Sequence, residues 1–278
     1  MEAICQICGG RDFKPFAIKE GVHYLECAAC GSLKHTPYPS PQQIEQFYAG
    51  YPATKSETSV YLTESGYAGY QRDKTFTFAD LRIDPVEFRQ KTLLDVGCAT
   101  GQFIRFMSDP QFGLKSARGI DISAACIETA RQHDLNCSVE DFLSVEERFD
   151  VISMWHLIEH LPDPKPFFEH AFQLLRPGGL FLVETPIVGI VANSFASTWR
   201  FLMPVEHLNL FSQSALFTLA TKCGFNIRSF VSFGSGNTGN TVPAVNKRAM
   251  DAMVKQLGCG DVLAVLFTKP SAVDQPAS

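Results

Sequence analysis

The sequence predicts an α/β fold, in which a doubly wound and largely parallel sheet follows a small cysteine-rich unit. Three observations predict it. From Thr92 onward, apolar runs of strand length alternate with helical segments, the order that builds a parallel sheet. The first of these runs ends in an acid and two glycines, within Asp95–Gly101. Two pairs of cysteines stand within the first 30 residues, and 278 residues give room for one large domain with a small attachment.

Composition and charge restrict the classes of function. The formal net charge is −5, which argues against a broad surface for nucleic acid or for an anionic membrane. The chain reaches its first cysteine at position 5 with no basic and apolar leader before it, unlike a signal peptide. The richest apolar stretch, Gly179–Phe195, is interrupted by Glu184 and Pro186, so no spanning helix is expected. We therefore expect a cytoplasmic protein without membrane insertion.

Residues 1–40 are predicted to form a zinc ribbon with two short strands, Phe13–Ile18 and Val22–Glu26. Its ligands would be two C-x-x-C-G pairs separated by 18 residues: Cys5, Cys8, Cys27 and Cys30. Two such pairs suit tetrahedral Zn²⁺ with four thiolates, and a site closed in this way has a structural role. A redox-active dithiol is the weaker alternative, because it would need only one C-x-x-C pair and the chain has two. The other five cysteines are scattered singly, as reduced thiols would be.

Residues 41–90 are predicted to be a helical, tyrosine-rich connector. Ser40 and Pro41 give the start of one helix, as a cap followed by a proline, and a second helix is expected over Tyr70–Leu81. Five of the seven tyrosines of the chain crowd this segment, namely Tyr48, Tyr51, Tyr61, Tyr67 and Tyr70. A tyrosine has an apolar body and a polar tip, which suits either a half-wet pocket wall or the packing of a helical cap.

The stretch Thr92–Met107 predicts a strand, a tight turn and a helix. Gly97 and Gly101 let the backbone pass close beneath a ligand, and Asp95 stands where its carboxylate can meet a positive charge. The dinucleotide fingerprint would need glycines at positions 99 and 102, and neither is present. The pattern therefore suits a ligand with an ammonium and a carboxylate better than a pyrophosphate. Asp121 lies 20 residues beyond Gly101, the spacing at which an acid binds a ribose diol.

The acid–glycine stretch resembles motif I of the class I methyltransferases that use S-adenosylmethionine (SAM). Phe149–Ile152, Glu159–Pro164 and Leu174–Gly179 agree with this resemblance, which spans roughly residues 90–230. It implies SAM as cofactor and a Rossmann-like sheet of seven strands with an antiparallel last strand. The cofactor-binding positions that it implies are Asp95, Gly97, Cys98, Gly101, Asp121, Ile122, Asp141, Phe142 and Met154. Another interpretation is equally open, in which Asp141 is an acid in a turn and Phe142 is a phenylalanine of the core.

Residues 91–270 are predicted to be the SAM-binding domain, and residues 271–278 a tail. The segment from about 186 to 210 is longer than a typical α/β connection and is apolar. A segment of this kind at the carboxyl end of the sheet suits a substrate lid. Beyond it, Ser212 is expected to cap a helix, followed by a strand over Asn226–Phe233, a helix over Pro243–Leu257 and a closing strand over Asp261–Thr268.

Ribbon, helical connector, SAM domain and the Glu206-His207 stretch together resemble one methyltransferase group. This group includes the deoxysugar C-methyltransferases of sugar-nucleotide pathways and related enzymes of polysaccharide clusters. The resemblance implies His207 as the general base with Glu206 beside it, although leucines replace the tyrosines usual in this stretch. His160 is the second candidate and His156 the third, since a histidine pKa suits proton removal near neutral pH. A purely positional mechanism is the alternative.

Three functions follow as candidates. The first is a SAM-dependent methyltransferase acting on a small polar acceptor, such as a sugar nucleotide or glycan intermediate, at oxygen, carbon or nitrogen. The second is an RNA methyltransferase, since some carry a zinc ribbon, but the acidic balance of the chain counts against nucleic acid. The third is a non-catalytic SAM-fold module whose ribbon docks a partner. The complete set of cofactor motifs favours the first.

Overall fold

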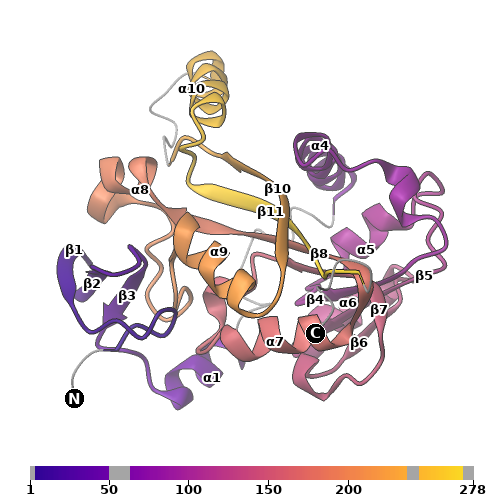
Figure 1. Ribbon diagram of the computed structural model, residues 1–278, viewed down its shortest axis with the longest axis horizontal. Coiled ribbons are helices and arrows are strands. Elements are labelled where there is room, and N and C mark those ends of the chain that lie inside the picture. The colour runs from indigo at the N-terminus through magenta and orange to yellow at the C-terminus, as the bar shows by residue number, and fades with distance from the viewer. Residues whose placement is uncertain (1–3, 50–62, 237–243, 272–278) are drawn as a thin grey trace.

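The computed structural model describes residues 4–49, 63–236 and 244–271 (Figure 1). At its centre lie seven strands in the spatial order β10 (Asn226–Phe233), β11 (Val262–Thr268), β8 (Leu175–Val188), β7 (Phe149–Trp155), β4 (Thr92–Val96), β5 (Ser116–Asp121) and β6 (Cys137–Val139). Only β11 is antiparallel to its neighbours, whereas the pairs from β8 to β6 are parallel. A short eighth strand, β9 (Phe211–Ser212), pairs with β8 off this path. The expected α/β sheet with an antiparallel last strand is confirmed.

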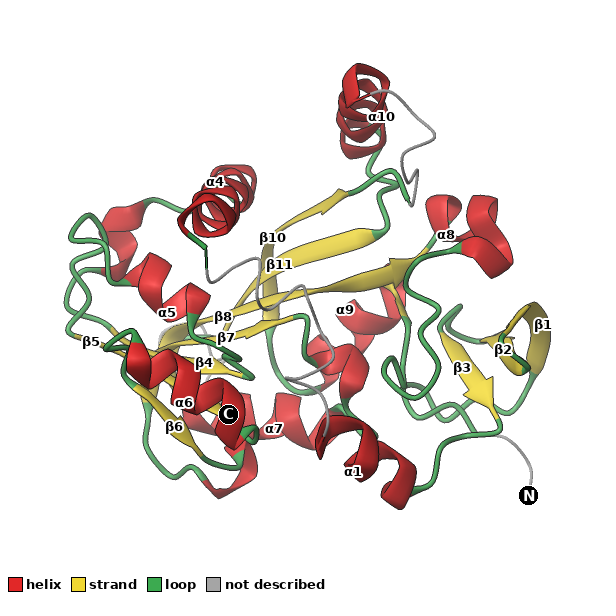
Figure 2. Ribbon diagram, turned by 180° about the vertical axis from the view of Figure 1, so that it is seen from behind, coloured by secondary structure: helices red, strands yellow, loops and turns green. Residues whose placement is uncertain are grey.

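Helices cover both faces of the sheet. One face carries α4 (Glu64–Asp80), α5 (Gln102–Met107) and α6 (Ala124–Gln132), and the other carries α7 (Lys165–Leu174) and α9 (Gln213–Lys222) (Figure 2). Side chains alternate along β8, so that Phe181 and Val183 join the core under α7 and α9 while Leu180 and Leu182 join the core under α4 and α5. Burial on both faces explains why the central strands are apolar almost throughout.

The described residues contain further helical elements outside these two layers. They are α1 (Pro41–Ala49), α8 (Ile190–Phe195), α10 (Ala244–Gln256) and short 3₁₀ turns at Pro85–Phe88, Phe142–Ser144, Ile158–His160 and Ala196–Thr198. The expected lid segment contains α8 and the last of these turns. None of the helices in the described ranges combines the length and apolar character needed to cross a bilayer.

Several element boundaries differ from the sequence expectation. The helix expected from Tyr70 begins earlier, at Glu64, because the Thr63 hydroxyl accepts from the Gly66 amide and caps it. Strand β6 ends at Val139, two residues before Asp141, because Asp141 caps the 3₁₀ turn that follows. Strand β8 extends to Val188, past the expected end at Glu184, because β9 and β11 both pair with its final residues.

The N-terminal unit is a three-stranded antiparallel sheet of β1 (Phe13–Lys19), β2 (Val22–Cys27) and β3 (Leu33–Thr36). The third strand was not expected from the sequence. This small sheet lies against the lid segment (Figure 1). Leu33 pairs through its backbone with Leu210, and both side chains share an apolar cluster with Trp199. Two of the connector tyrosines, Tyr51 and Tyr61, and the side chain of Tyr48 lie outside the described residues.

Candidate functional site

A deep pocket opens at the carboxyl ends of the parallel strands, where α/β sheets bind their ligands. Its volume is about 1580 Å³, above the roughly 300–1,000 Å³ of a site for one small ligand. One wall, here called the glycine side, consists of residues 95–100, 102, 120–126 and 140–142. The opposite wall, here called the ion-pair side, includes Tyr70, Lys74, residues 155–157 and 160–162, and Glu184. The pocket therefore has room for two ligands next to each other.

The glycine side is shaped by the turn between β4 and α5. Gly97 and Gly101 have backbone φ angles of +69° and +83°, in the left-handed region that favours glycine. A Cβ atom on Gly97 would lie 2.8 Å from a methyl group of Leu157, and one on Gly101 would lie 2.7 Å from a methyl group of Leu135. Gly97 and Cys98 line the pocket directly, whereas Gly101 shapes the turn from behind it.

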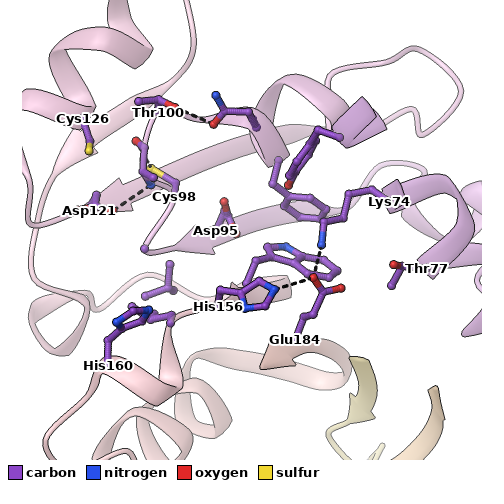
Figure 3. Close-up of a pocket in the computed structure, with 18 of the residues that line it drawn as sticks. Lys74, Thr77, Asp95, Cys98, Thr100, Asp121, Cys126, His156, His160 and Glu184 are labelled. Atoms are coloured by element: carbon purple, nitrogen blue, oxygen red, sulfur yellow. Dashed lines mark hydrogen bonds and ion pairs between the residues drawn. The ribbon is translucent and has the colours of Figure 1, made fainter. Parts of the chain in front are cut away.

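Asp95 lies at the end of β4 and faces the pocket (Figure 3). Its side chain is almost fully buried, and the Ser153 hydroxyl donates to its Oδ1 atom over 2.7 Å. Burial raises the pKa of Asp95 to about 7, in spite of the opposing effects of Ser153 and Lys74. A buried carboxylate in this state gains most from a ligand that brings a positive charge.

Asp121 ends the neighbouring strand β5 and organises the same turn. Its Oδ2 atom accepts from the Ala99 amide over 2.9 Å, and its Oδ1 atom accepts from the Ser123 amide over 2.8 Å. Ala99 has a φ angle of +46°, so this contact helps to hold a strained residue in the turn. Each carboxylate oxygen has a further lone pair, which a ligand hydroxyl in the pocket can use.

The far end of the glycine side is more apolar. Ile122 is 70% exposed although it is apolar, and it lines the pocket together with Asp141 and the buried ring of Phe142. An exposed isoleucine beside a cavity suits the face of a flat ligand ring. Met154 lies elsewhere, fully buried in the core beneath the pocket, so its side chain supports the floor from behind.

A chain of paired charged groups forms the ion-pair side (Figure 3). Lys74, Glu159 and Glu184 are buried, whereas the side chain of His156 is 42% exposed. Lys74 of α4 donates from Nζ to Glu184 Oε1 over 2.7 Å, and His156 Nε2 lies 3.2 Å from the same oxygen. The other ring nitrogen of His156 lies 3.2 Å from Glu159 Oε1, and the Thr185 hydroxyl donates to Glu159 Oε2 over 2.9 Å. Two cations and two carboxylates are thus joined in one network.

Electrostatics fix the ionisation of this network. Burial would lower the pKa of His156, but the hydrogen bonds and negative charges of Glu159 and Glu184 raise it to about 9. Burial would likewise raise the pKa of each glutamate, and the cations instead lower both to about 2. His156 has a φ angle of +49°, so the ring that carries this charge follows a strained backbone. It acts as a fixed cation, which makes it a poor base near neutral pH.

His160 and His207 form a second polar group next to this network. His160 lines the pocket, and its Nδ1 atom lies 3.0 Å from the backbone oxygen of Glu206. His207 lies behind His160, with a ring-centroid distance of 4.9 Å, and its Nδ1 atom lies 2.8 Å from the Phe201 oxygen. Burial lowers the pKa of His207 to about 3. His207 was expected to face the pocket, but the structure places His160 there instead.

Glu159, His160 and His207 each bring one ligand-type atom to within 4.8 Å of the other two. A divalent cation could bridge atoms at this spacing. Both Glu159 oxygens, however, already accept hydrogen bonds from His156 and Thr185. We therefore treat the three side chains as part of the hydrogen-bonded network.

The four N-terminal cysteines converge, as their spacing predicted. The Sγ–Sγ distances are 3.7 Å for Cys5 and Cys30 and 3.6 Å for Cys8 and Cys27, and all four sulfur atoms lie within 4.8 Å of one another. Tetrahedral zinc with bonds of about 2.3 Å would separate its sulfur ligands by about 3.8 Å. The Gly10 amide also donates to Cys8 Sγ over 3.3 Å, as amides do around zinc thiolates. The cluster is compatible with zinc.

Sequence reasoning missed the two residues that anchor the ion-pair side, Lys74 and Glu184. They are 110 positions apart, and each looks like an ordinary charged residue in its own element. One signal was available. Glu184 lies within a strongly apolar strand, so a charge at that point had to be paired or exposed to a cavity. No comparable signal marks Lys74 within the sequence of α4.

The comparisons with known proteins agree with this architecture. The sequence profile of a family described as a methyltransferase domain matches residues 69–229, more than half of the chain. The structure also resembles the crystal structure of a sarcosine dimethylglycine methyltransferase from Galdieria sulphuraria. The TM-score is 0.52 at 16% identity, over 82% of this chain and 98% of that one. This likeness concerns the fold alone.

Two curated relatives carry the name ubiquinone biosynthesis O-methyltransferase. The protein of Cereibacter sphaeroides is 31% identical over 135 residues, and that of Parvibaculum lavamentivorans is 33% identical over 138 residues. These matches cover 45% and 46% of this chain and 50% and 53% of the relatives. The chain thus spans about half the length of the curated relatives it matches. Neither relative is named as a sugar C-methyltransferase.

Proposed function

The chain belongs to the methyltransferase domain family and is a SAM-dependent methyltransferase, and from that premise we propose that it methylates a hydroxyl oxygen of a small acceptor with His160 as the base. The names of the two relatives support oxygen as the methylated atom. The volume of the pocket supports a small acceptor next to the cofactor. The sulfonium of SAM makes its methyl group electrophilic, so the protein has to align the nucleophile and accept its proton.

The contact between His160 Nδ1 and the backbone oxygen of Glu206 is the observation that carries the proposal. A backbone carbonyl can only accept a hydrogen bond, so the Nδ1 atom of His160 must carry the hydrogen toward the Glu206 oxygen. The neutral ring then has its lone pair on Nε2. His160 also lines the pocket, so this nitrogen belongs to a group within reach of a bound acceptor. A base held in one tautomer is ready to take a proton from a hydroxyl.

His207 and Glu206 are positioning residues in this proposal. His207 is a weak base because its pKa is lowered to about 3, and its Nδ1 atom is engaged by Phe201. Its ring packs edge-to-face against His160 and limits the rotation of that side chain. Glu206 contributes its backbone oxygen to the same end. The Glu206-His207 stretch thus supports catalysis without contacting the reacting atoms.

The glycine side is proposed to hold SAM. Asp95 would pair with the ammonium of its methionine part, since the buried carboxylate gains most from a cation. Asp121 would accept from the ribose hydroxyls, and Ile122 and Phe142 would cover the adenine ring with Asp141 at its edge. Met154 would act only through the floor of the pocket. This assignment uses the residues implied by the family resemblance.

We also propose that Cys5, Cys8, Cys27 and Cys30 hold one structural zinc ion. Their sulfur distances fit the tetrahedral ion, and four protein ligands leave no open position for a substrate. The zinc would stabilise the turns that carry β3 against the lid segment.

The experiment that tests the base compares His160→Gln with His133→Gln, an exposed histidine at the end of α6. SAM binding is measured by calorimetry, and methyl transfer is measured with labelled SAM on a panel of phenols, a sugar nucleotide and RNA. We expect His160→Gln to lower kcat by about 10²–10⁴-fold at unchanged SAM affinity, with His133→Gln unaffected. An unchanged kcat in His160→Gln would remove it as the base. Transfer to RNA alone would replace the small-acceptor proposal.

A further inference from the structure

The Glu184 carboxylate is used on one side only. Its Oε1 atom accepts from Lys74 and lies next to His156, at 2.7 and 3.2 Å. Its Oε2 atom is buried and has no hydrogen-bond partner among the residues that the structure describes. The side chain is 6% exposed and lines the pocket. The wall of the site therefore contains a buried acceptor atom without a hydrogen-bond donor among the described residues.

An unpaired carboxylate oxygen in a buried position is costly. Folded proteins pair nearly all buried polar atoms, and a buried charged acceptor without a donor carries a large desolvation penalty. The network around Glu184 keeps this oxygen ionised, so it can accept but cannot donate. A ligand that brings a donor to Oε2 would remove the penalty, and a ligand without one would leave it in place.

The charge of the network limits the kind of donor. Lys74 and His156 balance Glu159 and Glu184, so the group as a whole is neutral. A cationic ligand would add an unbalanced charge on the ion-pair side, whereas a neutral hydroxyl would not. A neutral hydrogen-bond donor therefore suits Oε2 better than a cationic one.

Trp155 gives a second unpaired group on the same wall. Its indole Nε1 atom is buried and also has no partner in the described part of the chain. Trp155 and Glu184 are register partners on the neighbouring strands β7 and β8, and the Lys74 ammonium lies 3.8 Å above the centroid of the Trp155 ring. The wall thus offers one atom that needs a donor and one that needs an acceptor. A hydroxyl-bearing ring can supply both.

We propose that Glu184 determines acceptor specificity, with its Oε2 atom accepting a hydrogen bond from a neutral hydroxyl of the acceptor other than the hydroxyl that is methylated. This inference rests on the proposed function of the pocket. The shared chemistry is a ring with at least two hydroxyl groups, and both a phenolic ring and a saturated ring can provide it. Glu184 is a poor base in its lowered-pKa state, so its role is recognition.

The test uses the zinc-loaded full chain saturated with S-adenosylhomocysteine and follows tryptophan indole signals by ¹H–¹⁵N NMR. The chain has two tryptophans, and Trp199 Nε1 donates to Asp261 Oδ2 over 3.1 Å, so its signal serves as an internal reference. The probes are catechol and cis-1,2-cyclohexanediol, each compared with its dimethyl ether. We expect at least one diol to shift the Trp155 signal and to bind on the order of tenfold tighter than its ether. Binding of catechol would identify a phenolic ring in the acceptor, and binding of cis-1,2-cyclohexanediol would identify a saturated ring.

Glu184→Gln is the matching variant, because it keeps the shape and replaces the charged acceptor by an amide. Glu87→Gln is its control, since Glu87 pairs with Arg228 at 2.6 Å and lies outside the pocket. The difference in affinity between the diol and its ether should fall to within about threefold in Glu184→Gln and stay unchanged in Glu87→Gln. Equal binding of diol and ether to the unmodified protein, or no Trp155 response while the cofactor product binds, would overturn the inference. Failure of the cofactor product to bind would instead overturn the proposed function.

Discussion

The two walls of the pocket are built in opposite ways. On the glycine side, contacts within two neighbouring strand–turn units join four residues, namely Asp95, Gly97, Ala99 and Asp121. On the ion-pair side, Lys74 reaches Glu184 across 110 positions, and His160 reaches the Glu206 backbone across 46. The turn of the glycine side is held by residues that lie fairly close in the chain, since Ala99 and Asp121 are 22 positions apart. The second wall exists only when distant segments are folded together.

The ribbon is connected by hydrogen bonds to the ion-pair side. The Ser212 hydroxyl donates to the Cys30 oxygen over 2.5 Å, and the Ser212 amide donates to the Ser32 hydroxyl over 3.0 Å. Four residues before Ser212, the Leu208 amide donates to the Glu159 oxygen over 2.8 Å. The cysteine cluster is thus connected to the ion-pair side through a few hydrogen bonds. It has no comparable connection to the glycine side in the described residues.

The largest expected effect comes from the ribbon. Replacing Cys27 and Cys30 by serine should prevent metal binding, loosen the lid segment and abolish methyl transfer, because the proposed structural zinc would contribute directly to folding. SAM affinity should change by less than about threefold if the two walls are independent. Metal content by mass spectrometry and SAM titration by calorimetry measure the two effects. Cys223→Ser, outside the cluster, should keep both properties, and a parallel loss of SAM binding would show that the walls are coupled.

The second prediction concerns Asp95 and acts on the opposite wall. Asp95→Asn should weaken SAM binding by roughly 10–100-fold, because it removes the charge that meets the ligand ammonium. The same change should raise the melting temperature at pH 8, since the buried carboxylate is ionised there at a cost to the folded state. Calorimetric titration and thermal unfolding measure the two effects. A variant that loses both affinity and stability would contradict this account of Asp95.

The third prediction is a pH dependence of SAM binding. The pKa of Asp95 is about 7 in the folded protein against 3.8 for an unperturbed aspartate, so the free protein takes up a proton on this group as pH falls below 7. We propose that the Asp95 carboxylate pairs with the ammonium of SAM, so the affinity for SAM should fall by up to about tenfold per pH unit between 7 and 5. Folding stability should change in the opposite sense and rise over this window as Asp95 is protonated. Titrations from pH 8 to 5 measure the affinity, and Asp95→Asn should flatten the curve.

The smallest expected effect compares two helix caps. Ser123 caps α6 next to the glycine side, and Ser212 caps α9 next to the ribbon. Either change to alanine should cost about 1 kcal/mol of stability. Ser123→Ala should alter mainly the SAM affinity, and Ser212→Ala should alter mainly kcat. Chemical denaturation and steady-state kinetics measure these effects, and the same kinetic change in both variants would remove the distinction between the walls.

The sequence was sufficient for features that depend on neighbours in the chain. The glycine turn, the position of Asp121 and the four-cysteine cluster follow from spacing, because backbone conformation and metal geometry demand particular residues at fixed offsets. The orientation of His207 did not follow, since it depends on the Phe201 oxygen and on the packing of the lid. The pairing of Lys74 with Glu184 was equally hidden, because no local pattern marks a lysine that will be buried. Strand β3 was missed because its four residues form a strand only beside β2.

The backbone pairing of Leu33 with Leu210 has a consequence for how the protein can be divided. The ribbon and the lid bury apolar side chains in a single cluster. The ribbon contributes Tyr24 and Leu33, and the lid contributes Trp199, Leu202 and Leu210. A chain cut at residue 40 would leave an apolar surface on each fragment, and such surfaces favour aggregation. The ribbon boundary that the cysteine spacing predicts, at residue 40, therefore separates segments that share one apolar cluster. Grafting experiments with this enzyme would have to move the ribbon and the lid together.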